Sequence, residues 1–403
     1  MKNYFRASAY YVIATLVSMM VIACDDDEYT PNIGIPDMTN LTIDNQFPII
    51  AWTGIDYEDT FEKMDKMKDC GINIYLGWYD SFEKLDHVMN YADKNGVKLI
   101  VQCEELLSNP ETIVPEMMKH PSLFAYYIED EIEEGDFAKN ATVINTISSI
   151  DSKHPCYINL YPNWAWGSID SYEYKLVSYV SSVPVKFLSF DQYPIIQQKG
   201  EISLREYWYK NLEDIRRVSR AKNMPFWAFA LSLSHQLGDI LYPVPTLGHI
   251  RLQMFSNLAY GAQGFQYFTY WGIFHDEPTE VYDIVKTVNK ELQSLSKIFL
   301  GASIDGVWHT GSNIPYGTKA LKEMPRGISS IKTSDSGALV SHIVNKGKEY
   351  VAIVNKSFDK TMDLSISFDK TTGKIDKSGN STTILKEDVT VDPGDIVIYQ
   401  LNE

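Results

Sequence analysis

Cysteine is scarce in this chain, and its cysteines do not suggest a disulfide framework. The 403 residues include four cysteines. Cys24 closes an N-terminal apolar run, which leaves the odd number of three, Cys70, Cys103 and Cys156. Cys103 and Cys156 fall within apolar runs typical of strands. We therefore expect buried free thiols and not a fold held together by disulfides.

Several motifs that mark a particular chemistry are also missing. The first apolar run leads into Ala51–Ile55, which lacks the glycine-rich phosphate loop, so nucleotide binding is not expected. A Gly-x-Ser-x-Gly elbow is absent, which argues against an esterase. No histidine, cysteine and aspartate cluster has metal-ligand spacing, and the run His275–Glu277 alone does not define a metal site. We expect neither a metal nor a cofactor.

Positive charge is in short supply. Lysine and arginine number 36 against 53 aspartates and glutamates, giving a net charge of −17. An acidic surface of this kind argues against nucleic acid as a partner. No second long apolar run follows the N-terminal one, and the length suits one domain of roughly 250 residues plus a smaller one.

The first 24 residues resemble a processing signal and are not expected to belong to the fold. Lys2 and Arg6 form a basic start, and an apolar run covers Tyr10–Ala23. The run ends in Val21-Ile22-Ala23-Cys24, which resembles a bacterial lipobox, where the cysteine is acylated and becomes the mature N-terminus. A membrane-spanning helix is the alternative, but the run is short for a span of about 20 residues. We expect a lipid on Cys24 and anchoring to the bacterial outer membrane.

An acidic run, Asp25–Glu28, follows the expected lipid anchor. It resembles the surface-export signal of some glycan-foraging Gram-negative bacteria, although a solvated tether would have the same composition. In either case the protein is expected outside the cytoplasm, with residues 25–45 as a linker.

Eight apolar, β-rich runs alternate with helical patterns between residues 46 and 300. They are Phe47–Trp52, Ile72–Tyr79, Lys98–Glu104, Ser122–Glu131, Cys156–Tyr161, Val185–Pro194, Pro225–Leu231 and Gly264–Trp271. Near-continuous apolar strands alternating with helices indicate parallel pairing buried on both faces. Eight such units predict a closed (β/α)8 TIM barrel, although an open doubly wound sheet has similar local periodicity.

The pattern changes beyond residue 300. Short alternating runs are separated by turns such as Asn345–Gly347 and Pro393–Asp395. They are Gly306–His309, Leu339–Val344, Tyr350–Val354, Met362–Ile366, Thr382–Ile384 and Asp395–Leu401. Antiparallel strands joined by tight turns predict a small C-terminal β-sandwich over residues 301–403.

The fourth barrel run ends in an acidic cluster, Glu129-Asp130-Glu131. The carboxyl ends of barrel strands meet at one mouth, where active sites are built. The apolar neighbours before the cluster would favour a protonated Glu131, as a general acid requires, and Asp130 could accept hydrogen bonds from sugar hydroxyls. The alternative is that these acids begin a solvated helix and complement its dipole.

The run His120–Glu131 resembles the fourth strand of bacterial glycoside-hydrolase-like barrels. These are related to the clan of retaining enzymes that includes β-galactosidases and β-glucanases. Three further segments resemble that clan: Phe190–Pro194, Gln253–Gly264 and Tyr267–Trp271. The resemblance implies a glycoside hydrolase with Glu131 at the acid/base position and Trp271 beneath the reacting sugar. The clan's Asn-Glu pair is Asp130-Glu131 here, which changes the hydrogen bonding to the neighbouring hydroxyl.

The seventh run departs from the clan. Its nucleophilic glutamate belongs at the end of that strand, but Pro225–His235 contains no carboxylate. Asp191 is the preferred second acid, because it ends a strand two positions from the fourth and lies within reach across the mouth. A role for Asp191 in holding substrate or a loop is equally open. The other acids that could serve are Glu104, Glu105, Asp276 and Glu277.

Aromatic and histidine side chains near the strand ends are candidates for substrate binding. Trp271 could form a stacking platform or be a core aromatic, and Tyr193 could donate to a substrate oxygen. Trp52 and Trp78 could add walls, and His235 could contact substrate, although a lone loop histidine is more often structural. Two tryptophans, Trp164 and Trp166, lie in the loop after the fifth strand, where aromatics are costly unless covered or used.

The sequence thus leaves two main classes of function. The preferred one is a glycoside hydrolase acting on an extracellular oligo- or polysaccharide, with carbohydrate as its partner. The rival is a barrel that has lost a catalytic carboxylate and serves as a surface glycan-binding lipoprotein. A polysaccharide lyase or esterase on the same scaffold is a third class. The sugar, the linkage and the oligomeric state depend on loop shapes that the sequence does not reveal.

Overall fold

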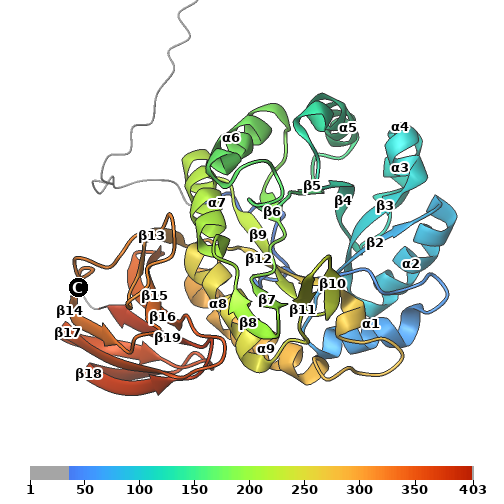
Figure 1. Ribbon diagram of the computed structural model, residues 1–403. Coiled ribbons are helices and arrows are strands. Elements are labelled where there is room, and N and C mark those ends of the chain that lie inside the picture. The colour runs from blue at the N-terminus through green and yellow to red at the C-terminus, as the bar shows by residue number, and fades with distance from the viewer. Residues whose placement is uncertain (1–35, 402–403) are drawn as a thin grey trace, which may run out of the picture. The chain divides into compact units, whose positions relative to one another are not determined.

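The computed structural model describes residues 36–401 (Figure 1). The expected signal sequence, Cys24 and most of the expected linker lie outside this range. Within residues 36–401, no helix is long and apolar enough to cross a membrane.

Eight parallel strands form the barrel predicted from the sequence (Figure 1). They are β1 (Ile49–Trp52), β2 (Ile74–Tyr79), β3 (Lys98–Cys103), β4 (Leu123–Asp130), β5 (Cys156–Asn159), β6 (Leu188–Phe190), β9 (Phe226–Leu231) and β12 (Gly264–Phe268). Hydrogen bonding runs from β5 through β4, β3, β2, β1, β12 and β9 to β6. A parallel bridge between Leu160 and Phe190 joins β5 to β6, which closes the barrel and excludes the open sheet.

Helices cover the outside of the barrel and supply the crossovers that parallel strands need. They are α1 (Thr60–Asp69), α2 (Phe82–Asn95), α3 (Glu104–Ser108), α4 (Pro110–Met117), α5 (Phe137–Ile150), α6 (Tyr172–Ser182), α7 (Trp208–Lys222), α8 (Leu247–Tyr260) and α9 (Tyr282–Phe299). Gly96 and Gly261 end α2 and α8 in the left-handed conformation, which a residue without Cβ adopts at little cost.

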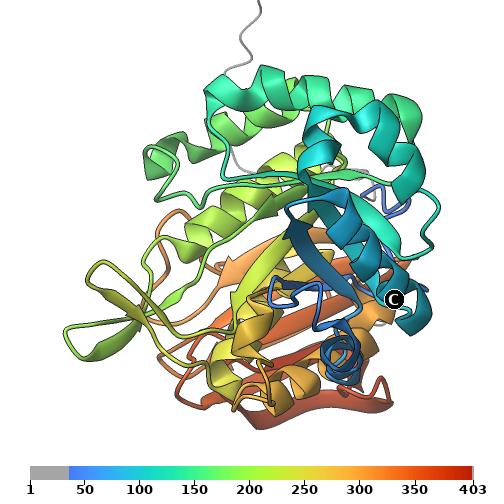
Figure 2. The ribbon, with the colours of Figure 1, turned by 90° about the vertical axis from the view of Figure 1, so that its right-hand side faces the viewer.

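A small second sheet was not predicted. It has four antiparallel strands, β7 (Ile195–Gln198), β8 (Glu201–Leu204), β10 (His235–Leu237) and β11 (Ile240–Tyr242). The β7–β8 hairpin follows β6 and the β10–β11 hairpin follows β9, so both extend the carboxyl ends of barrel strands. Figure 2 shows the two hairpins projecting together from the barrel. We call these four strands the accessory sheet.

The C-terminal residues form seven antiparallel strands. They are β13 (Ser303–His309), β14 (Ile328–Thr333), β15 (Ala338–Asn345), β16 (Lys348–Asn355), β17 (Met362–Ile375), β18 (Ser381–Val391) and β19 (Ile396–Leu401). The long strand β17 pairs with β14, β18 and β19, so the sheet folds over its own apolar cluster in a sandwich-like form. The predicted C-terminal architecture is confirmed, although β14 was missed.

Polar contacts join the C-terminal sheet to the barrel helices. The Ser341 hydroxyl donates to the carbonyl of Ala259 at 2.7 Å, and the Asn345 amide donates to the carbonyl of Ile298 at 2.8 Å. Asn345 is buried, so its amide satisfies a carbonyl at the end of α9 that water does not reach. Cys70, Cys103 and Cys156 are buried and unpaired, as expected.

Candidate functional site

The acidic cluster divides at the end of β4. Glu129 turns toward the helices, where it accepts a 2.8 Å hydrogen bond from Asn140 of α5. Asp130 ends β4, and Glu131 follows with a φ of 53° in the left-handed region. The Glu131 N–H donates to the carbonyl of Asn159 at 2.9 Å, which holds this turn against β5. A non-glycine residue kept in this sparsely populated conformation is a feature of functional sites.

Asn159, the last residue of β5, connects two carboxyl groups of the mouth. Its side-chain amide donates to Asp130 Oδ1 and to Asp191 Oδ1, each at 3.1 Å. The Ser189 hydroxyl donates to Asn159 Oδ1 at 2.9 Å, so the amide is oriented with its nitrogen toward the acids. Asp191, directly after β6, is thereby brought beside the end of β4, as the barrel order predicts.

Burial and neighbouring negative charge raise the pKa of the carboxyl groups at the mouth. Burial, followed by the charge of Asp130, raises the pKa of Glu131 to about 7. Burial, followed by the charges of Glu131 and Asp130, raises the pKa of Asp191 to about 8. Glu131 and Asp191 are only partly accessible to solvent, which agrees with a desolvated carboxyl group. The charge of Glu131 therefore acts on Asp191 across the mouth.

A buried polar network lies beneath these acids inside the barrel. Gln266 of β12 is its hub: its oxygen accepts from the Trp52 indole at 3.2 Å and from the Tyr157 hydroxyl at 2.9 Å. Its nitrogen donates to Ser189 Oγ at 2.9 Å. Since Ser189 orients Asn159, the network links four strands, β1, β12, β5 and β6, to the carboxyl groups above.

The predicted aromatic residues divide between the barrel interior and the surface. Trp78, at the end of β2, and Trp271, after β12, are 50% and 45% exposed. Trp52 is only 3% exposed and is packed edge-on against Phe229 and Tyr157. The expectation that Trp52 forms a wall for substrate is therefore corrected: its indole belongs to the interior network, and its ring meets that of Trp78 edge-on at 6.4 Å.

Tyr193 and His235 lie together beside Asp191. The Tyr193 hydroxyl interacts with the Asp191 carboxyl and partly offsets the rise of its pKa. His235, at the start of β10, meets the Tyr193 ring edge-on at 6.3 Å and stacks on Tyr242 at 4.5 Å. Burial lowers the pKa of His235, so its ring favours the neutral form. The accessory sheet thus places the ring of His235 against Tyr193, which contacts Asp191.

Two of the other acids considered for the second position have partners outside this group. Glu105 accepts from the Phe82 N–H at the start of α2, and Asp276 is exposed and pairs with His275. At the end of β9, where the clan places its nucleophile, Ser232 donates to the Thr269 carbonyl. The charge of Glu131 contributes to the raised pKa of Asp191, which agrees with the choice of Asp191 as the second acid.

Sequence reasoning missed the residues that hold the acids in place. Asn159, Ser189 and Gln266 sit inside apolar runs, and only their polarity at buried strand positions could have marked them. Within residues 36–401, no group of three or more His, Cys, Asp or Glu side chains is arranged to hold a metal ion.

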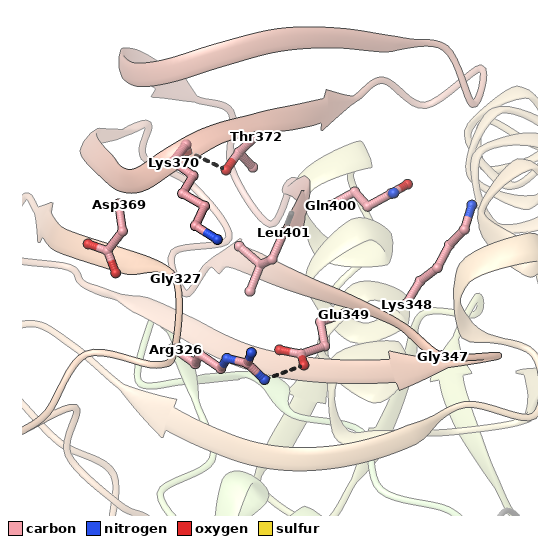
Figure 3. A pocket seen from close by; sticks show the side chains of 10 residues that line it. All are labelled: Arg326, Gly327, Gly347, Lys348, Glu349, Asp369, Lys370, Thr372, Gln400 and Leu401. Carbon is pink, nitrogen blue, oxygen red and sulfur yellow. Dashed lines mark hydrogen bonds and ion pairs between the residues drawn. The ribbon is translucent and has the colours of Figure 1, made fainter. Parts of the chain in front are cut away.

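A separate cavity of about 340 Å³ lies on the C-terminal sheet (Figure 3). Its lining includes Arg326 and Glu349, whose side chains form an ion pair at 3.1 Å. Asp369, Lys348 and Lys370 also line it.

Comparison with solved structures supports the fold. A structure named "putative alpha-galactosidase" from Bacteroides fragilis matches with a TM-score of 0.52 at 10% identity, covering 89% of this chain and 80% of that one. An alpha-L-arabinofuranosidase from Thermotoga maritima matches with a TM-score of 0.46 at 8% identity, over 84% of this chain and 89% of that one. No protein-family model and no curated relative matches the chain. The resemblance to glycoside-hydrolase barrels is thus confirmed as a resemblance of fold.

Proposed function

We propose that this protein is a glycoside hydrolase that cleaves O-glycosidic bonds of an extracellular oligo- or polysaccharide. Glu131 is the general acid/base, and Asp191 is the second carboxylate. The arrangement of acids at the ends of neighbouring strands carries this proposal. The Asn159 amide donates to both Asp130 and Asp191 at 3.1 Å, and burial and nearby carboxylates raise the pKa of Glu131 to about 7 and that of Asp191 to about 8. The fold neighbour from Bacteroides fragilis bears the name of a glycosidase, which supports the class of reaction.

Glycoside cleavage needs one protonated and one charged carboxyl group on either side of the scissile bond. A neighbouring negative charge favours a state in which two acids hold one proton between them near neutral pH. The pKa of Asp191 is the higher of the two, so in the free site Asp191 holds this proton more readily than Glu131 does. The proposed roles need this proton on Glu131 once substrate is bound. Glu131 donates it to the leaving oxygen as the bond to the sugar carbon breaks. Asp191, as a carboxylate, attacks that carbon or takes a proton from the attacking water. Asn159 stabilises the charged form of Asp191 by its hydrogen bond.

Four further residues are proposed to bind the sugar. Asp130 accepts hydrogen bonds from hydroxyls, and Tyr193 donates to a substrate oxygen or to Asp191. Trp271 and Trp78 offer exposed aromatic faces on which sugar rings stack. His235 has a secondary role, because its ring is already stacked on Tyr242.

Substitution of Glu131 tests the proposal. Wild-type protein is incubated with a panel of plant, microbial and host glycans, and released sugars are measured. Glu131→Gln should lower the rate by about 10²- to 10⁴-fold, the usual contribution of general acid catalysis. Glu129→Gln is the matched control, because this acid of the same cluster faces α5 and should leave the rate nearly unchanged. Equal loss in both variants would contradict the assignment.

The absence of a carboxylate at the end of β9 favours one other candidate, a surface protein that binds glycans without cleaving them. Ser232 there is engaged with the Thr269 carbonyl and is 1% exposed, so it does not replace a nucleophile. Saturable glycan binding by the wild type with no released product, even after long incubation, would establish this alternative.

We also propose that Cys24 carries a lipid that anchors the protein to the outer membrane, on the surface or facing the periplasm. The lipobox-like run before Cys24 supports this proposal. Labelling of cells with a palmitate analogue should mark the wild type and not Cys24→Ala, and protease treatment of intact cells reports surface exposure. A labelled Cys24→Ala protein would contradict the assignment.

A further inference from the structure

Two exposed tryptophans lie on opposite sides of the strand that carries Glu131. Trp78 lies one residue before the end of β2 and is 50% exposed, while Trp164 follows β5 and is 38% exposed. The hydrogen-bonding order around the barrel is β2, β3, β4, β5, so the end of β4 lies between them. An extended ligand that reached from Trp78 to Trp164 along the ends of these strands would therefore pass Glu131.

The Trp78 side is connected to the acids through Tyr127. The negative charges of Asp130, Glu129 and Glu131 act on the Tyr127 hydroxyl and add to the effect of burial in raising its pKa. The Trp78 ring lies 6.0 Å from that of Tyr127 and 6.4 Å from that of Trp52. Packing on two buried rings fixes Trp78 and leaves half of it open to solvent.

The Trp164 side is connected to the acids through the accessory sheet. Tyr193, beside Asp191, meets His235, and His235 stacks on Tyr242. Arg205, directly after β8, donates to the Tyr242 hydroxyl at 2.6 Å, and its guanidinium lies 4.5 Å from the centre of the Trp164 ring. A stacked arginine holds the indole in place through a cation–π contact. The accessory sheet is thereby tied to an exposed aromatic face.

We propose that the carboxyl group at the mouth receives an internal stretch of a neutral glycan chain, bound by Trp78 on one side and by Trp164 on the other. Sugar rings present apolar faces that stack on aromatic rings. Exposed aromatic side chains such as Trp78 and Trp164 are typical of binding surfaces. A site that binds only the end of a glycan needs an aromatic surface on one side of the acids. Here exposed tryptophans lie on both sides, which favours an internal stretch of the glycan. The carboxyl groups of Asp130, Glu131 and Asp191 would repel an anionic sugar bound between the tryptophans.

This inference rests on the proposed function in one respect, since the same acids mark the point of cleavage. It is tested by binding, which does not require turnover. Glu131→Gln protein is titrated calorimetrically with cello-, xylo-, manno- and chito-oligosaccharide ladders, from disaccharide to octasaccharide. Affinity should rise with length. Trp78→Ala and Trp164→Ala, each made in that background, should weaken binding of the longest oligomer by about tenfold and that of the disaccharide far less.

Matched variants separate stacking from folding. Tyr174→Ala removes an aromatic side chain that is 74% exposed on the outer helix α6, and it should leave binding unchanged. Trp164→Tyr keeps an aromatic face and should restore most of the affinity lost in Trp164→Ala. Circular dichroism of each variant checks the fold.

Three results would overturn the inference: no ladder is bound, disaccharide and octasaccharide bind equally, or only one tryptophan matters. These results differ from failure of the proposed function. Length-dependent binding through both tryptophans without any hydrolysis by the wild type would leave the inference standing and remove the hydrolase. Hydrolysis that releases single sugars from chain ends, unaffected by Trp164→Ala, would keep the hydrolase and remove the inference.

Discussion

The side-chain amide of Asn159 donates a 3.1 Å hydrogen bond to the carboxyl group of Asp191, from the end of one barrel strand to the end of the next. The contact opposes the rise in the pKa of Asp191 that burial and the charge of Glu131 cause. Asn159 also donates to Asp130, so a single amide favours the charged form of two acids. This relationship makes the pH behaviour of the site testable.

Removal of this amide should shift the pH dependence of activity. Asn159→Ala is expected to raise the pKa of Asp191 further, because the hydrogen bond that favours its charged form is lost. The acidic limb of the kcat/KM profile should move to higher pH by about one unit, the scale of a hydrogen bond to a charged group. Asn140→Ala removes an amide from Glu129 on the helix side and should leave the profile in place. A shift of similar size in both variants would contradict the role of Asn159.

Neutralisation of Asp191 should change the pH dependence of stability. Its pKa is raised from 3.8 to about 8, so the folded state binds a proton more readily than the unfolded state between these values. Wild-type stability therefore falls as the pH rises through this range. Asp191→Asn should unfold at a higher temperature than the wild type at pH 8.5, by about 2 °C or more, with little difference near pH 4. Calorimetric scans across this pH range would reveal the difference, and an unchanged slope would disprove the assigned shift.

The position of Trp271 should depend on Gly54. Gly54 has a φ of +117°, and a Cβ there would lie 3.1 Å from the backbone nitrogen of Trp271 and 3.3 Å from Cδ1 of its indole. Gly54→Ala should destabilise the protein by more than the roughly 1 kcal/mol that positive φ costs an alanine. Gly200→Ala is the control, with a φ of +87° and no atom near the added methyl group. Urea unfolding and tryptophan fluorescence should separate the two variants, and equal losses would rule out the contact.

The interior network should depend on Gln266. Gln266→Leu leaves the buried Trp52 indole and Tyr157 hydroxyl without their shared acceptor, although Tyr157 keeps its contact with Ser189. Unsatisfied buried groups cost about 1 to 3 kcal/mol each, so we expect a loss of about 3 kcal/mol. Gln236→Leu changes an exposed glutamine of β10 and should cost little. Chemical denaturation measures both, and a loss below about 1 kcal/mol for Gln266→Leu would show that the network is not important for stability.

Local patterns were enough to predict the barrel. All eight strands were located within a few residues, because parallel strands buried on both faces leave continuous apolar runs between helix-ending residues. The C-terminal strands were likewise visible as alternation with tight turns. β14 was missed, and its central residues, Ser329–Lys332, are only partly buried or exposed.

Other features depend on contacts that no local pattern contains. The accessory sheet pairs Leu241 with Gln197, residues far apart in the chain. Trp52 is the last residue of β1 and Trp78 lies one residue before the end of β2. Contacts with neighbouring strands, which no local pattern shows, bury Trp52. The outward turn of Glu129 likewise depends on Asn140 of α5.

The sequence by itself determined the order of strands and helices and the place of Glu131 at the end of a strand, since hydrophobic period and turn residues act over a few positions. Only the tertiary structure decided which groups surround that carboxyl group. Closure of the barrel places the ends of β4, β5 and β6 side by side, and the pKa of an acid depends on burial and on charges brought near it through space.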